Sequence, residues 1–137
     1  MTEAFLDTGY IIALEAADDQ RHQVAVKHWQ SLTSSFSLPR LVTTSFILDE
    51  AVTFLNSRNQ HAKAVEVGNR LMGSPSVKFV HVDEALFYEG WRYFEQHTDK
   101  AYSLTDCISF VLMEQLGIQT ALAFDKHFAQ AGFQKLP

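Results

Sequence analysis

The sequence has little cysteine, proline or glycine, and it lacks a long uncharged hydrophobic run. A single cysteine, Cys107, cannot form an intrachain disulfide, which is typical of a reducing compartment. Three prolines and six glycines form no linker, and no repeat divides the chain, so we expect one domain over residues 1–137. No basic segment precedes a long apolar run, so neither a signal peptide nor a membrane span is predicted. The expected location is cytoplasmic.

The sequence also lacks a net positive charge and several nucleotide-binding or catalytic motifs. The formal net charge is −5, and the eleven lysines and arginines are scattered. A polyanionic partner would therefore need a local basic rim or a metal ion. The patterns GxxxxGK[ST], GxGxxG and GxSxG are absent, which leaves P-loop, dinucleotide and nucleophile-elbow chemistry without support. The six histidines show no zinc-type pairing, so we interpret them as surface or boundary residues.

What the sequence does contain is a set of short apolar runs that alternate with helical segments. Strands are predicted over residues 3–6, 41–44, 77–82 and 119–124. Helices are predicted over residues 10–14, 20–33, 45–58, 60–72, 83–97, 104–116 and 126–131. Strands separated by one or two helices form a parallel sheet covered on both faces. The predicted fold is α/β, a three-layer α/β/α sandwich with a central parallel sheet.

Four carboxylates occur where the surrounding sequence is apolar: Asp7, Glu50, Asp106 and Asp125. Asp7 and Asp125 each end an apolar run, and ligands of α/β proteins bind beyond the carboxyl ends of the strands. Burying converging carboxylates without a counter-charge costs on the order of several kcal/mol. A divalent cation would remove this cost, so the four acids are candidates for a metal site.

Helix capping is the alternative explanation for the acids that follow strands. Aspartate is a favoured N-cap, and capping accounts for Asp7 and Asp125 as well as a ligand role does. Asp83 is a useful control, because it also ends a strand and begins an amphipathic helix. Capping is sufficient there, so we interpret Asp83 as structural.

Glu50 is preferred over its neighbour Asp49 on helical geometry. Glu50 lies at the edge of the apolar face, between Phe46 and Phe54 at four residues on either side. Asp49 falls in the polar arc with Thr53. We therefore expect Glu50 to point into a cleft and Asp49 to be solvated.

Asp106 belongs to Ser103-Leu104-Thr105-Asp106, which also fits a capping box. The helix that follows is apolar nearly all round and is therefore expected to be buried. Its first-turn acid would then face the edge of the sheet, where the helix N-terminus favours a negative charge. Thr105 or Ser109 could support the cluster by hydrogen bonding.

Four motifs span nearly the whole chain: Phe5–Leu14, Glu50 in its helix, Ser103–Asp106 and Ala123–Phe128. Together they resemble the PIN domain family, most closely the VapC-type toxins and their stand-alone relatives. The resemblance implies metal-dependent endonucleolytic cleavage of RNA, with Asp7, Glu50, Asp106 and Asp125 as catalytic metal ligands. It also implies supporting hydroxyls at Thr8 and Thr105. Ala123 departs from the threonine that relatives often carry there.

The cofactor and partners follow from the same resemblance. Ligands that are all oxygen favour Mg²⁺ or Mn²⁺ over zinc. The expected partners are an RNA substrate, a second copy in a homodimer and, for a toxin of a type II toxin–antitoxin system, a cognate antitoxin that inserts a basic side chain into the cleft. Residues near the motifs are candidate contacts for the RNA backbone: Arg40, Lys100, Lys126 and His127.

Two alternative functions stay open at this point. One is a PIN-like scaffold that has lost catalysis. The other is a phosphoreceiver-like regulatory domain, although receivers need adjacent acids after the first strand and Leu6-Asp7-Thr8 supplies only one. The aromatic stretch Phe87–Phe94 could stack bases, but its helical spacing favours a core or dimer face.

Overall fold

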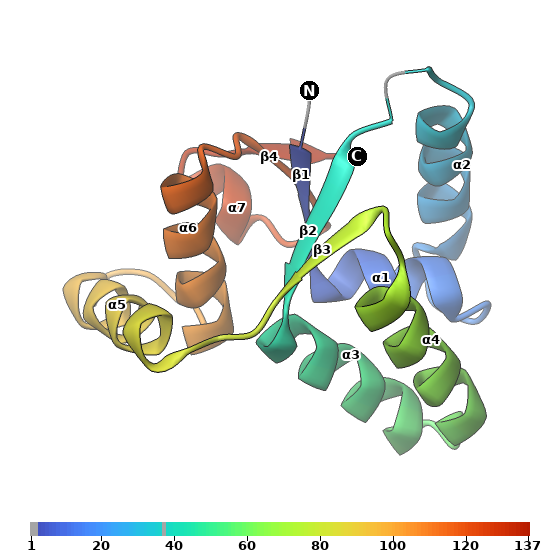
Figure 1. The fold of residues 1–137 in the computed structure, drawn as a ribbon, viewed down its shortest axis with the longest axis horizontal. Coiled ribbons are helices and arrows are strands. Elements are labelled where there is room, and N and C mark those ends of the chain that lie inside the picture. Colours follow the sequence, from blue (N-terminus) through green and yellow to red (C-terminus); the bar gives the residue numbers. More distant parts are fainter. Residues whose placement is uncertain (1–2, 37) are drawn as a thin grey trace.

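The computed structural model describes residues 3–36 and 38–137 (Figure 1). Its strands are β1 (Glu3–Leu6), β2 (Arg40–Thr44), β3 (Val77–Val80), β4 (Thr120–Leu122) and β5 (Gln134–Leu136). Its helices are α1 (Thr8–Glu15), α2 (His22–Thr33), α3 (Ser45–Ser57), α4 (His61–Gly73), α5 (Glu84–Gln96), α6 (Leu104–Leu116) and α7 (His127–Gln130). Among the described residues, no helix has the length and hydrophobicity that crossing a membrane requires.

The strands form one sheet in the order β3-β2-β1-β4-β5, and every neighbouring pair is parallel. Helices α1 to α4 lie on one side of the sheet and α5 to α7 on the other (Figure 1). This arrangement confirms the predicted three-layer α/β/α sandwich with a central parallel sheet.

The central strands are buried because both faces of the sheet are covered. Phe5 of β1 pairs with Val42 of β2 on one side and with Ala121 of β4 on the other, and all three side chains are fully buried. Apolar residues in succession, rather than in alternation, are what such strands require. The same pattern made these strands predictable from the sequence.

The fifth strand was missed. β5 pairs with β4 in parallel, with Gln134 opposite Thr120 and Leu136 opposite Leu122. It lies at the edge of the sheet, where side chains meet water, and its residues Gln134, Lys135 and Leu136 are exposed or only partly buried. An edge strand of this kind has no apolar run to reveal it. β3 and β4 are also shorter than predicted.

Helix α6 is held in place at both of its ends and along its side. It begins at the N-cap Ser103 and ends at Gly117, which adopts a left-handed conformation with φ of 69°. Gly90 of α5 lies so close to α6 that a Cβ there would collide with Ile108. The predicted helix over residues 104–116 is confirmed, and the close packing fixes α6 against α5.

The order of the strands creates a crevice at the carboxyl ends of β1 and β4. These two strands are neighbours. The chain leaves β1 toward α1 on one side of the sheet and leaves β4 toward α7 on the other (Figure 1). Crevices of open α/β sheets form where neighbouring connections diverge in this way. Asp7 follows β1 directly, and Asp125 lies just beyond β4.

Candidate active site

The four candidate carboxylates line one open pocket of about 620 Å³ at this crevice. Asp7 and Asp125 come from the segments after β1 and β4, Glu50 from the second turn of α3, and Asp106 from the first turn of α6. The fold thus brings together four acids that are far apart in the sequence.

Asp7 is the most deeply buried of the four acids, at 6% exposure. Its backbone N–H donates to the carbonyl of Leu122 at 3.1 Å, which ties the end of β1 to β4. Asp7 occupies the N-cap position of α1, yet its side chain accepts no capping hydrogen bond from that helix. The capping alternative therefore does not account for this carboxylate.

The surroundings of Asp7 disfavour its charged form. Burial raises its pKa from 3.8 to about 7, although the backbone N–H of Thr8 acts in the opposite direction. The negative charges of Asp106, Asp125 and Glu50 raise it further. A carboxyl group with such a shift, in a cleft with other acids, is typical of a functional site.

Glu50 is positioned by the start of α3 and by a threonine of α1. The Thr44 hydroxyl caps α3 by accepting from the backbone N–H of Ile47 at 3.2 Å. The Thr8 hydroxyl donates to Glu50 Oε1 at 2.6 Å. This bond crosses the crevice from α1 to α3 and directs Glu50 along the pocket wall.

Asp49 and Glu50 are both exposed but have different partners. The carboxylate of Asp49 accepts a hydrogen bond from Thr53 at 3.2 Å, within its own helix. Asp49 does not line the pocket, whereas Glu50 does. The helical geometry that distinguished the two residues in the sequence corresponds to this placement.

Asp106 combines the capping role with a place in the pocket. The Ser103 hydroxyl accepts from the Asp106 N–H at 3.0 Å, and Asp106 Oδ2 accepts from the Ser103 N–H at 3.1 Å, so the capping box is present. The residue is nevertheless only 8% exposed. Burial raises the pKa of Asp106, opposed by the Ser103 and His127 hydrogen bonds and assisted by the charge of Asp125. Capping and pocket lining are therefore compatible here.

The second supporting threonine has a different position from the first. Thr105 does not line the pocket with the acids. Its backbone carbonyl accepts a hydrogen bond from the Ser109 hydroxyl at 2.8 Å, inside α6. Of the two predicted hydroxyls, the structure brings only that of Thr8 into contact with one of the four carboxylates among the residues it describes.

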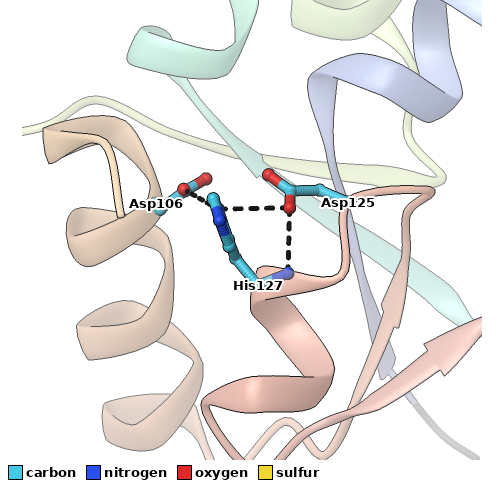
Figure 2. A group of neighbouring side chains, drawn as sticks. All are labelled: Asp106, Asp125 and His127. Atoms are coloured by element: carbon cyan, nitrogen blue, oxygen red, sulfur yellow. Dashed lines mark hydrogen bonds and ion pairs between the residues drawn. The ribbon is translucent and has the colours of Figure 1, made fainter. Parts of the chain in front are cut away.

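His127 lies between Asp106 and Asp125, as Figure 2 shows. Its Nδ1 is 3.0 Å from Asp106 Oδ2 and 3.1 Å from Asp125 Oδ1, and its backbone N–H donates to the same Asp125 oxygen at 2.9 Å. Within the described part of the chain, these three residues are the group whose ligand atoms all lie within 4.8 Å of one another.

Sequence reasoning treated His127 as a boundary residue and a candidate RNA contact, and so missed its place between two acids. The available signal was its position two residues after Asp125, where a turn can bring its ring back to the acid. His127 is the first residue of the short helix α7. The sequence lacks the short histidine spacing of zinc sites, but a turn can place a histidine beside an acid without that spacing.

Basic residues are found at the rim of the pocket rather than among the acids. Arg21 and Lys126 line it, and the Arg21 guanidinium lies over the ring of Phe124 at 5.2 Å from its centroid. Arg40 is the first residue of β2 and so lies at the amino ends of the strands, away from the pocket. Lys100 pairs with Asp99 at 3.6 Å. Arg21 was missed, because nothing in its neighbourhood in the sequence points to the acids.

The pocket suits a hard divalent cation. Across residues 3–36 and 38–137, no lysine or arginine forms an ion pair with any of the four acids; His127 is their one basic contact. Carboxylate oxygens that converge without such a partner are the ligands that Mg²⁺ and Mn²⁺ prefer. The pKa of Asp7 is raised first by burial and then by the charges of the other three acids, and a bound cation would oppose both effects.

Comparisons with known proteins identify the family of the chain and relatives of its fold. A family model described as "PIN domain" matches residues 4–134. The chain is 36% identical over 129 residues to the 23S rRNA-specific endonuclease VapC20 of Mycobacterium tuberculosis, covering 94% of both proteins.

Two solved structures show the same fold. The crystal structure of M. tuberculosis VapC20, described as a sarcin–ricin loop cleaving toxin, has a TM-score of 0.85 at 35% identity and 95% coverage of both chains. The crystal structure of FitAcB from Neisseria gonorrhoeae has a TM-score of 0.63 at 19% identity, covering 98% of this chain and 96% of that one. The second likeness concerns the fold alone.

Proposed function

The chain belongs to the PIN domain family, and from this premise we propose that it is a metal-dependent endoribonuclease that hydrolyses RNA phosphodiester bonds. We further propose that it is the toxin of a type II toxin–antitoxin system. The ligands of its metal ion, Mg²⁺ or Mn²⁺, would be the four pocket acids: Asp7, Glu50, Asp106 and Asp125.

One observation carries the proposal. Four carboxylates from four separate segments line one pocket at the crevice between β1 and β4. Burying Asp7 beside other acids has a cost in stability, visible in its pKa, which burial first and the neighbouring charges second raise to about 7. A structural role does not explain that cost, whereas a cation bound for phosphodiester chemistry does.

The residues around the pocket then have separate tasks. The acids would hold the metal and would not act as nucleophiles; a bound divalent cation would supply polarisation of the phosphodiester and a water of lowered pKa. Thr8 holds Glu50 in place through its 2.6 Å hydrogen bond, and Ser103 holds Asp106. Arg21 and Lys126 at the rim would attract the RNA backbone to the pocket.

The substrate class is RNA, and ribosomal RNA is the first substrate to test. This choice rests on the similarity to VapC20, whose name specifies 23S rRNA. Such cleavage would take place in the cytoplasm. The phosphoreceiver alternative has no comparable support, since Thr8 occupies the position after Asp7 where a receiver needs a second acid.

Two partners are also proposed. A cognate antitoxin would place a basic side chain among the acids and so neutralise the same charge as the metal. A homodimer would cover part of the apolar surface; Tyr88, Trp91 and Phe94 of α5 are 51%, 43% and 41% exposed. The adjacent reading frame should be inspected for a small DNA-binding protein, and light scattering would give the oligomeric state.

The proposed activity can be tested with two substitutions in the pocket and one matched control. Asp7→Asn and Glu50→Gln should each reduce Mn²⁺-dependent cleavage of ribosomal RNA by more than about 100-fold, because each removes a charged ligand without changing shape. Asp49→Asn is the matched control, one residue from Glu50 but outside the pocket. Cleavage is measured by gel assay, and folding by circular dichroism.

The outcomes separate the proposed enzyme from a silent scaffold. Loss of cleavage in both pocket variants, with the control fully active, supports the metal site. Cleavage by Asp7→Asn at the parent rate would show that the assignment is wrong. A parent protein that folds and binds Mn²⁺ but cuts no RNA would favour the scaffold alternative instead.

A further inference from the structure

We propose that His127 is a nitrogen ligand of the metal ion, together with Asp106 and Asp125, and that it gives the site a preference for Mn²⁺ over Mg²⁺. The inference rests on the metal-dependent function proposed above. It adds to the four acids a residue of a different donor type, on the side of the pocket that α6 and α7 form (Figure 2).

The distances around Nδ1 carry the proposal. This atom lies 3.0 Å from Asp106 Oδ2 and 3.1 Å from Asp125 Oδ1. Neighbouring ligands of an octahedral ion with bonds of about 2.1 Å are about 3.0 Å apart. The nitrogen is therefore spaced from each of the two oxygens as neighbouring ligands of one ion are, and all three ligand atoms lie within 4.8 Å of one another.

The imidazole is also held in this orientation by its surroundings. The His127 backbone N–H donates to Asp125 Oδ1 at 2.9 Å, so the main chain and the ring face the same carboxylate. The ring packs edge-on against the largely buried Tyr102, with centroids 5.4 Å apart. The His127 side chain itself is only 17% exposed. A ring confined in this way can bind an ion with little loss of conformational entropy.

A nitrogen donor changes which ion is preferred. Mg²⁺ takes oxygen ligands, usually carboxylates and water, whereas imidazole suits transition metals better. An all-acid pocket would distinguish Mn²⁺ from Mg²⁺ only weakly. One imidazole added to two carboxylates should favour Mn²⁺.

The competing explanation is that His127 only clamps the two acids through hydrogen bonds from Nδ1–H. The measured distances fit that role too. The two roles differ in a property that can be observed directly. A ligand brings its nitrogen into contact with the unpaired electrons of Mn²⁺, whereas a clamp keeps a proton between its nitrogen and the acids.

The test uses the full chain loaded with Mn²⁺. Pulsed electron paramagnetic resonance should show coupling to a histidine nitrogen in the parent and none in His127→Ala or His127→Gln. Calorimetric titration should show that both variants bind Mn²⁺ at least about tenfold more weakly, with a smaller change for Mg²⁺. Glutamine keeps the bulk and a hydrogen-bond donor, which guards against loss of folding. His81→Ala, far from the acids, is the matched control and should behave like the parent.

Each outcome has a defined meaning. Nitrogen coupling that disappears with His127 supports the ligand role. Binding of Mn²⁺ that requires Asp7 but shows no nitrogen coupling, and is unchanged in His127→Gln, overturns the ligand role and leaves the proposed nuclease site standing. Nitrogen coupling that survives in an Asp7→Asn variant with undiminished affinity supports the ligand role and contradicts the four-acid site. A parent that binds no Mn²⁺ overturns both.

Discussion

Two hollows at the carboxyl edge of the same sheet contain similar side chains and differ in how these side chains meet. The larger lies beyond β1 and β4 and contains the four acids and His127. The smaller, of about 210 Å³, lies beyond β3 and is lined by His81, Asp83 and Glu89, among others. Among the residues described, only the larger one brings carboxylates and a histidine within 4.8 Å of one another.

The position of each hollow in the sheet explains the difference. β1 and β4 are interior neighbours whose connections leave to opposite sides, so α1, α3, α6 and α7 all reach the crevice between them. β3 is an edge strand, and the hollow beside it is reached by α5 and α6 alone. Asp83, beside the edge strand, stays exposed, whereas Asp106 and Asp125 at the centre lie around one histidine with ligand atoms within 4.8 Å.

Asp83 and Asp106 show the same contrast within one local motif. Each lies at the start of a helix and forms a capping hydrogen bond: Asp83 accepts from the Leu86 N–H at 2.8 Å, and Asp106 from the Ser103 N–H at 3.1 Å. Asp83 is exposed, and Asp106 is 8% exposed. Capping alone therefore does not distinguish a structural acid from a functional one; the depth at which the helix begins does.

The largest expected difference is between the two hollows when the same substitution, aspartate to asparagine, is made in each. Asp106→Asn should reduce metal-dependent RNA cleavage by more than about 100-fold, whereas Asp83→Asn should leave it unchanged. Asparagine keeps an oxygen that can accept the capping hydrogen bond, so both variants should fold. Cleavage rates at saturating Mn²⁺ and melting temperatures are the measurements. Equal activity in the two variants would mean that the crevice is not the reaction site.

A second prediction concerns stability without metal. The pKa of Asp7 is about 7 in the folded protein and near 3.8 when unfolded. The folded state therefore holds a proton that the unfolded state has lost, and the free energy of unfolding falls as pH rises between these values. Between about pH 5 and about pH 8 the loss from this group is on the order of 2 kcal/mol.

Urea denaturation in a metal chelator, at the two pH values, measures this effect. Asp7→Asn should remove most of the decrease, because asparagine carries no charge at either pH, while Asp83→Asn should show the parent decrease. The same Asp7→Asn variant should thus be more stable than the parent at about pH 8 and nearly inactive. A parent and an Asp7→Asn protein with the same pH dependence would contradict the raised pKa.

The sequence predicted the fold, which the structure confirms, and four candidate acids, which the structure places in the lining of one pocket. Apolar runs such as residues 3–6 predict strands that are buried on both faces of a sheet. The family motifs indicated Asp7, Glu50, Asp106 and Asp125. Helical geometry separated Glu50 from Asp49 because neighbouring residues of a helix point about 100° apart. These signals are local, and local signals can be read without a structure.

The rest depended on tertiary contacts. β5 has no apolar run, since an edge strand is defined by its partner rather than by its own residues. His127 becomes a neighbour of Asp106 only when α7 packs near α6. Arg21 joins the pocket lining where its guanidinium lies over the Phe124 ring, a contact between distant segments. Thr105 matched a family position, yet its place in α6 directs it elsewhere than the pocket lining.

The smallest effect is expected from removing the Asp83 side chain in the smaller hollow. Asp83→Ala removes the cap of α5 and should lower the free energy of unfolding by about 1 kcal/mol, or the melting temperature by roughly 2–5 °C. RNA cleavage and Mn²⁺ affinity should stay at parent values, because α5 contributes no side chain to the crevice. Thermal melts and calorimetric titration provide the two readouts. A loss of Mn²⁺ affinity in this variant would contradict the independence of the two hollows. The close Gly90–Ile108 contact of α5 and α6 would then be the route by which the cap of α5 affects the acids of the larger hollow.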